Sequence, residues 1–178
     1  MSSKLEGPES GPPKSRKKKK NREREFLVDL RGSFEEAGAF WHKIGDAPIF
    51  GGMKTRFTDS KPFDAMAIYK GVAIAIEAKY ISDYKAFGVK TLRPSQIDGL
   101  ESWSKSGGRS FIFLNIRRMA DKLSGTTRMN RMMIFEYEDL KYIGRNMKKV
   151  ELLDIPYVEG KKGRFDISRF LEMIERDV

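Results

Sequence analysis

The chain has 178 residues, 39% of them hydrophobic, a length and composition typical of one globular domain with its own core. It has no cysteine and a single histidine, His42, which excludes disulfides, cysteine-ligated zinc and a metal site built from histidines alone. Lysine and arginine (35) outnumber aspartate and glutamate (25), and the net charge of +10 favours a polyanionic partner, nucleic acid before an anionic membrane face.

No apolar run approaches the roughly 20 residues that span a bilayer. The amino terminus also lacks an apolar segment behind its charges, as a secretion signal would require. We therefore expect no membrane partner and a cytoplasmic location.

Residues 1–21 are rich in serine, proline, glycine and lysine, and the segment is predicted to be a disordered basic tail. Binding of phosphates without sequence preference is one interpretation of the tail; a localisation signal and an aid to solubility are the others. Residues 22–178 are expected to form the folded domain. The candidate DNA-binding residues of the tail are Arg16, Lys17, Lys18, Lys19 and Lys20.

Apolar residues at helical spacing predict a first helix that begins near Glu23 and ends near Gly38. Pro94 and the Gly107-Gly108 pair delimit a second, and "DISRFLEMIERDV" predicts a third, capped by Asp166 or Ser168. Strand-like runs occupy residues 40–44, 63–69, 72–80, 110–116 and 131–137.

These strands are apolar on both faces and so need cover on both sides. We therefore expect an α/β fold with a small mixed sheet flanked by helices. His42, in a strand-like run, is expected to be packed or on the surface rather than catalytic. Trp103 with Leu100, and Met129, Met132 and Met133, are expected in the core or in a dimer interface.

The connection from 45 to 62 is long for a compact domain, and such loops are usually functional or mobile. It carries three basic residues that are further candidates for DNA binding, Lys54, Arg56 and Lys61.

The stretch "FDAMAIYKGVAIAIEAKY" predicts a hairpin with Lys70-Gly71 as its two-residue turn. Carried along a regular ladder from this turn, the register puts Asp64 opposite Glu77, and Lys79 shares their face. Two carboxylates this close repel unless a cation sits between them. Oxygen ligands without histidine or cysteine point to magnesium, with manganese as a substitute.

A lysine beside such an ion completes the groups needed for metal-assisted phosphodiester hydrolysis. The alternative is structural: Glu77 and Lys79 would form a weak ion pair at the exposed end of an edge strand, and Asp64 would merely start its strand.

The chain resembles the PD-(D/E)-x-K nucleases, because "FD" is followed after thirteen residues by "EAK", with Phe63 where the family often has proline. Together with "RPSQIDGL" and "GGRSFIFLNI", the segment "KPFDAMAIYKGVAIAIEAK" resembles RecU-type Holliday-junction resolvases, phage versions included, over residues 23–178. The archaeal resolvases are similar over a shorter core.

The resemblance implies a restriction-endonuclease-like fold, a homodimer, and magnesium-dependent cutting of four-way DNA junctions by paired incisions. It implies a location on DNA or the nucleoid, or in the host cytoplasm for a viral protein. Asp64 and Glu77 match the metal-binding carboxylates, Lys79 the catalytic lysine, and Gln96 a glutamine that orients water or phosphate.

The family also supplies a glutamate from its first helix. At 100° per residue Glu23 lies about 20° from Leu30 on the buried stripe, whereas Glu25 and Glu35 lie about 140° away. Glu23 is therefore the candidate, although a glutamate in a first helical turn also simply favours the helix dipole.

Two other functions remain open at this point. One is a restriction-like or repair nuclease that acts on duplex DNA. The other is a non-catalytic DNA-binding protein that accompanies recombination, in which Asp64, Glu77 and Lys79 would be vestigial.

Overall fold

The computed structural model describes residues 14–45, 61–118 and 128–176, and only the backbone of 14–20. The helices are α1 (Lys14–Glu36), α2 (Pro94–Lys105), α3 (Tyr137–Ile143), α4 (Lys149–Leu153), α5 (Ser168–Arg176) and the 3-10 turn η1 (Val89–Thr91). The strands are β1 (Phe40–Lys43), β2 (Ala65–Tyr69), β3 (Val72–Ile81), β4 (Arg109–Arg118), β5 (Met129–Glu136), β6 (Val158–Lys161) and β7 (Arg164–Phe165).

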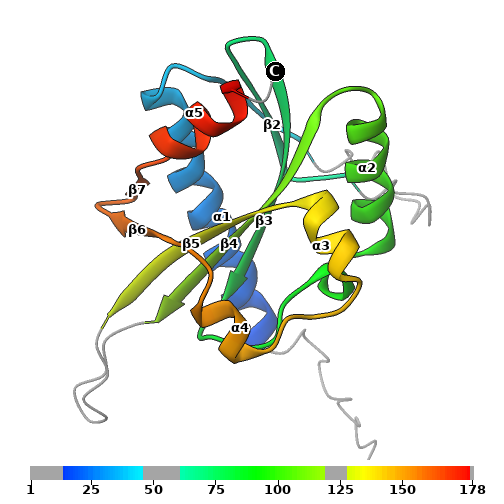
Figure 1. Ribbon diagram of the computed structural model, residues 1–178. Coiled ribbons are helices and arrows are strands. Elements are labelled where there is room, and N and C mark those ends of the chain that lie inside the picture. Colours follow the sequence, from blue (N-terminus) through cyan, green and yellow to red (C-terminus); the bar gives the residue numbers. More distant parts are fainter. Residues whose placement is uncertain (1–13, 46–60, 119–127, 177–178) are drawn as a thin grey trace, which may run out of the picture.

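Within the described residues, the strands form one seven-stranded sheet in the order of the chain, β1 to β7. Neighbouring strands are antiparallel except β3 and β4, which are parallel. A parallel pair needs a crossover, and α2 supplies it. This connection places α2 against β3 and β4 on one face of the sheet (Figure 1).

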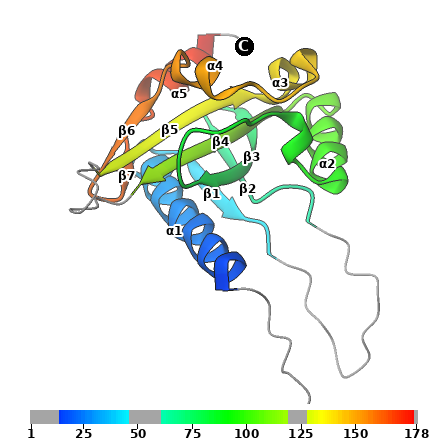
Figure 2. The ribbon, with the colours of Figure 1, turned by 90° about the horizontal axis from the view of Figure 1, so that it is seen from below.

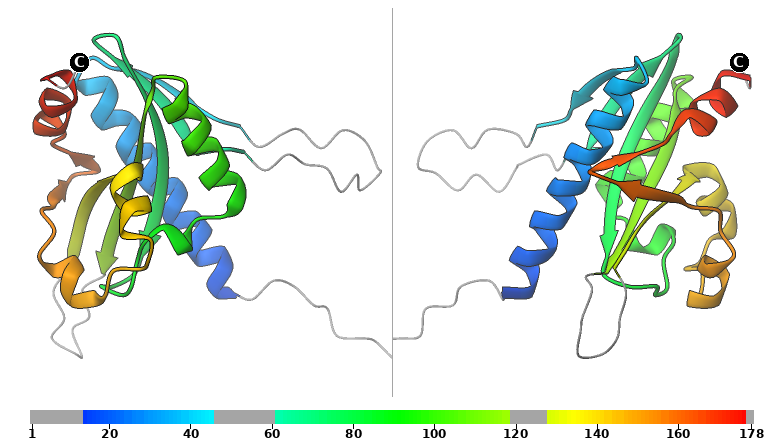
Figure 3. Two further views of the ribbon diagram at one scale, coloured as in Figure 1. Left: turned by 45° about the vertical axis from the view of Figure 1, so that its right-hand side comes forward. Right: turned by 90° about the vertical axis from the view of Figure 1, so that its left-hand side faces the viewer.

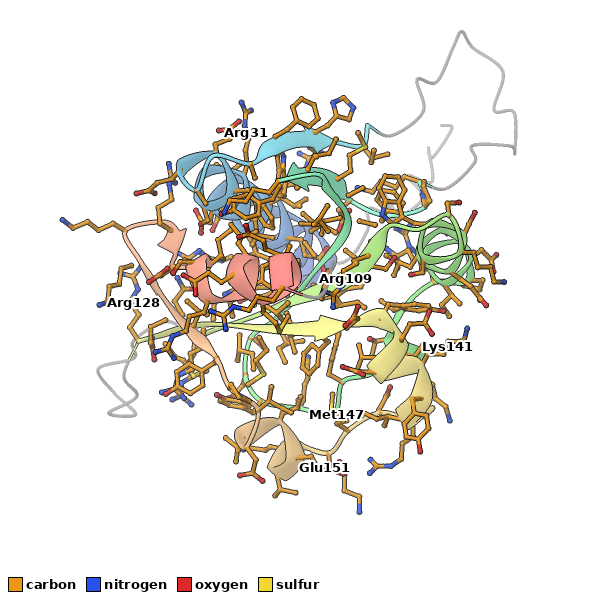
Figure 4. The ribbon with its side chains drawn as sticks, turned by 45° about the horizontal axis from the view of Figure 1, so that its top comes forward. Arg31, Arg109, Arg128, Lys141, Met147 and Glu151 are labelled. Carbon is orange, nitrogen blue, oxygen red and sulfur yellow. The ribbon has the colours of Figure 1, made fainter. Side chains whose placement is uncertain are left out.

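Helices cover both faces of the sheet. In Figure 2 and in the right-hand view of Figure 3, α1 lies on one side of the strands and α3 and α4 lie on the other. Figure 4 shows the same separation in side chains, with Arg31 of α1 far from Met147 and Glu151 near α4. The α/β class, with a mixed sheet flanked by helices, is confirmed.

Each face of the sheet has its own hydrophobic cluster. On one face Ile74 and Ile76 of β3 pack with α1 and α5, including Phe26 and Phe170. On the other, Ala75 of β3 packs with α2 and α3, including Leu100. Since side chains alternate along a strand, Glu77 and Lys79 belong to the face that α2 covers.

Several predicted elements are confirmed with shifts of a few residues at their ends, and the first helix differs most. It begins at Lys14 rather than near Glu23, so residues 14–21, expected in the disordered tail, are helical. Lysine and arginine are good helix formers, and the last prolines of this region are Pro12 and Pro13. The sequence did not predict α3, α4, β6 or β7.

Other predictions are resolved within the fold. Met129, Met132 and Met133 are buried, and Trp103 packs edge-on against Phe63, so these side chains belong to the core of this chain. His42 is exposed on β1. Asp166, one of the two predicted caps, lies just before α5, and its Oδ1 accepts the backbone N–H of Ser168, the first residue of the helix.

Gly99 of α2 gives a test of how the fold places the segment before β2. A Cβ at Gly99 would lie 2.2 Å from Cβ of Pro62 and 2.7 Å from its carbonyl oxygen. We expect Gly99→Ala to lower the free energy of unfolding by about 1–3 kcal/mol, although alanine in an open helix position would raise it by about 1 kcal/mol. Urea denaturation measures the change. Ser102→Ala, at an exposed position of the same helix, is the control; equal stability of the two variants would contradict the tight contact.

Candidate active site

The β2–β3 hairpin has the predicted turn and register. Lys70 and Gly71 both have positive φ, 45° and 88°, as a tight hairpin turn requires. Tyr69 pairs with Val72, and the ladder runs without interruption to Ala65 and Ile76.

Asp64 lies one residue beyond this ladder, and the prediction of a regular Asp64–Glu77 pair is wrong. The backbone N–H of Asp64 donates to the carbonyl of Ile76 at 3.0 Å, while its carbonyl accepts the N–H of Ile44 of the β1 side at 3.0 Å. Its side chain turns to β3, where Oδ2 accepts the N–H of Ala78 at 3.0 Å. The carboxylate thus takes a strand donor that a continued β2 would have paired, and it remains next to Glu77.

Glu77 is 1% exposed and lies on β3, in the interior of the sheet between β2 and β4. The alternative of an exposed ion pair on an edge strand is therefore wrong. Lys79 Nζ lies 2.7 Å from Glu77 Oε1, and its side chain is 16% exposed. The second oxygen, Oε2, is buried and has no hydrogen-bond partner.

Gln96, in the first turn of α2, connects the helix to both charged side chains of β3. Its Oε1 accepts hydrogen bonds from Lys79 Nζ and from the backbone N–H of Arg93, each at 3.0 Å. Its Nε2 donates to Glu77 Oε1. Because two donors face Oε1, the orientation of the amide is fixed, and Gln96 holds Lys79 beside Glu77.

Burial and the nearby charge of Asp64 raise the pKa of Glu77 to about 7. Lys79 and, more weakly, Lys61 act in the opposite direction. Lys61 was predicted to bind DNA, but its Nζ lies 2.5 Å from Asp64 Oδ1. The structure therefore brings together Asp64, Glu77, Lys79, Gln96 and, unexpectedly, Lys61.

The donor set of this cluster fits a hard divalent cation. Both carboxylates are buried, they repel each other, and Glu77 Oε2 has no partner. In the described parts of the chain no group of three or more acidic or histidine side chains forms a metal site. A cation would thus have two side-chain ligands here and take its others from backbone, water or substrate, as magnesium commonly does.

The other predicted site residues are not among the contacts given for this cluster, and several of them lie outside the residues that the structure describes. Glu23 is partly buried on α1, which packs on the face of the sheet opposite to that of Glu77. The side chains of Arg16, Lys17, Lys18, Lys19 and Lys20, like all of Lys54 and Arg56, lie outside the described residues. The proposed roles of these residues stay predictions.

One family model matches most of this chain. The model of the family RecU, recombination protein U, matches residues 52–173. A Holliday junction resolvase RecU from Shouchella clausii (strain KSM-K16) is 25% identical over 96 residues, 54% of this chain and 44% of the relative. The chain thus matches less than half the length of that relative.

Among solved structures, Hjc of Archaeoglobus fulgidus, a Holliday junction resolvase from an archaeal hyperthermophile, is similar to this chain. The TM-score is 0.46 at 19% sequence identity, and the match covers 70% of this chain and 85% of that chain.

The raised pKa of Glu77 predicts a particular pH dependence of stability. The folded protein binds this proton more tightly than an unfolded glutamate with pKa 4.5 does. The resulting stabilisation is complete below that value and is lost as the pH rises through about 7, a loss of up to about 3 kcal/mol. In EDTA, Glu77→Gln should remove this part of the pH dependence and be more stable than the unsubstituted protein at alkaline pH.

Urea unfolding over a series of pH values measures the effect. Glu138→Gln, at an exposed glutamate of α3, is the control and should keep the original profile. An unchanged profile in Glu77→Gln would show that the pKa of Glu77 is not raised.

Proposed function

This chain belongs to the RecU family, recombination protein U, and on that premise we propose that it is a magnesium-dependent endonuclease that resolves four-way DNA junctions. The observation that carries the proposal is the buried pair of Asp64 and Glu77, with Lys79 held against Glu77 by Gln96. The net charge of +10 supports a DNA substrate, and the name of the Shouchella clausii relative supports a Holliday junction as its form.

In this proposal Asp64 and Glu77 would hold the cation through Asp64 Oδ1 and Glu77 Oε2, the carboxylate oxygens that Ala78 and Lys79 do not contact. When bound, the ion supplies Lewis-acid chemistry: it polarises the phosphodiester and makes an attacking water more acidic. Manganese, with similar size and oxygen preference, is expected to substitute.

Lys79 supplies a fixed positive charge beside the reacting phosphate. Its ammonium is oriented by Glu77 Oε1 and Gln96 Oε1 before any substrate binds, so little reorganisation accompanies the reaction. Gln96 acts through Lys79 and Glu77, as a positioning residue. Burial of the cluster against α2 limits competing water and strengthens each of these electrostatic interactions.

Paired cleavage of a junction requires two such sites. A four-way junction has approximate two-fold symmetry, and a homodimer with the same symmetry would present one site to each of two opposed strands. The basic residues of the first helix, with Lys54 and Arg56 of the 45–62 connection, would then contribute phosphate contacts along the arms. The catalytic role of Glu23, on the same helix, stays a prediction, because α1 packs on the face of the sheet opposite to that of Glu77.

A nuclease for duplex DNA remains the second candidate, because the same buried cluster would serve it. Cleavage of a labelled immobile four-way junction, compared with linear duplex, fork and single strand in magnesium, separates the two. We expect symmetric nicks in the junction and little cleavage of the others. Equal cleavage of duplex would favour the second candidate, and no cleavage of any substrate would favour a DNA-binding protein without catalysis.

The assigned roles are tested by Asp64→Asn and Glu77→Gln. Each removes a ligand charge from the site but no phosphate-binding cation, so cleavage should fall by about 100-fold or more while junction binding in EDTA is retained. Single-turnover cleavage and gel-shift titration measure the two properties. Glu138→Gln should leave both unchanged. Cleavage at the original rate by either site variant would contradict the roles given to these carboxylates.

A further inference from the structure

Lys61 makes a short ion pair inside the site. Its Nζ lies 2.5 Å from Asp64 Oδ1, and the two side chains are 17% and 12% exposed. The other oxygen of Asp64 accepts the N–H of Ala78. Lys61 therefore contacts the Asp64 oxygen that β3 leaves available.

Lys79 pairs differently with the second carboxylate. It contacts Glu77 Oε1, which also accepts from Gln96, and leaves the buried Oε2 without a partner. A cation that takes Glu77 Oε2 therefore leaves Lys79 in place. A cation that takes Asp64 Oδ1 must replace Lys61.

The charges of the cluster also indicate that a divalent cation must replace Lys61. With two carboxylates and two ammonium groups the cluster has no net negative charge to attract a divalent cation. Removal of the Lys61 ammonium from Asp64 restores that attraction, because the interaction between charges at such short range is strong in a partly buried site. The positive charge of Lys61 also lowers the pKa of Glu77, so it favours the charged form of that carboxylate.

The backbone beside Lys61 is anchored, so this ion pair is a local property of the site. Pro62 packs against Gly99 of α2, and the ring of Phe63 meets that of Trp103 at 5.3 Å. Only the flexible side chain of Lys61 must rotate for its ammonium to leave Asp64.

We infer that Lys61 is a tethered cation that occupies the Asp64 half of the site when metal is absent and that a divalent metal ion must displace. This inference rests on the proposed metal site at Asp64 and Glu77. It assigns to Lys61 a role different from DNA binding: competition with the metal, which weakens metal affinity and keeps the metal-free site stable.

Isothermal titration with manganese, without DNA, tests the inference through binding rather than activity. Lys61→Met should bind manganese at least about tenfold more tightly than the unsubstituted protein, because one unit charge at short range is worth about fivefold in water and much more in a partly buried site. Lys61→Arg keeps the charge and should bind no more tightly than the original. Lys85→Met removes an exposed lysine and controls for the change in net charge.

Thermal unfolding in EDTA distinguishes direct pairing from a remote charge effect. Lys61→Met should unfold at a lower temperature than Lys85→Met, because Asp64 loses its partner, and saturating manganese should abolish this difference. Lys61→Gln, which keeps a polar group beside Asp64, serves as a second variant if Lys61→Met does not fold.

Equal manganese affinity in Lys61→Met and the unsubstituted protein would overturn the role of Lys61 and leave the metal site intact. Failure of both proteins to bind manganese would overturn the proposed metal site and this inference with it. Binding that appears only in Lys61→Met would support the competition strongly.

Discussion

The hydrogen bond from the N–H of Ala78 to Asp64 Oδ2 is the contact on which the site depends. It occurs where the β2–β3 ladder stops, and it fixes one oxygen of Asp64 against β3 next to Glu77. Two buried carboxylates at this place are unfavourable, because burial and their mutual repulsion penalise the charged forms and raise the pKa of Glu77, and the surrounding groups compensate for them. Lys61 and Lys79 each neutralise one carboxylate. Burial makes the two negative charges unfavourable by themselves, and it also strengthens their attraction for a cation.

The parallel pairing of β3 with β4 adds the second constraint. It requires a crossover, and the crossover places α2 on the face of the sheet that carries Glu77 and Lys79. The first turn of α2 then brings Gln96 over both side chains, and Gly99 allows the Pro62 segment to pack closely. The topology of the sheet thus assembles in one place residues that are far apart in the sequence.

The sequence was sufficient for the parts that follow regular patterns. Lys70-Gly71 defined the hairpin turn, and alternation along β3 placed Glu77 and Lys79 on one face. The position of Asp64 was harder, because an irregular strand end breaks the pairing that a regular ladder assumes. The ion pair of Lys61 depends on where the chain turns in space, although its place three residues before Asp64 was a usable signal.

The missed elements are short or polar. Lys162 and Gly163 have positive φ, 49° and 74°, as the two residues of the first hairpin turn do, but the strands beside them, "VEGK" and "RF", carry no apolar alternation. Helix α3 has Glu138 and Asp139 in its first turn and ends before Gly144, which adopts the left-handed conformation. Acidic residues in a first turn and a glycine after the last turn are sequence signals of helix ends.

The central claim is that Asp64 and Glu77 together hold a divalent cation. Crystals soaked in manganese, with diffraction measured at the manganese absorption edge, test it most directly. The account predicts an anomalous peak between Asp64 Oδ1 and Glu77 Oε2, with Lys79 still at Glu77 and Lys61 moved away from Asp64. Crystals saturated with manganese in which both lysines keep their partners and no anomalous peak lies between the carboxylates would contradict it.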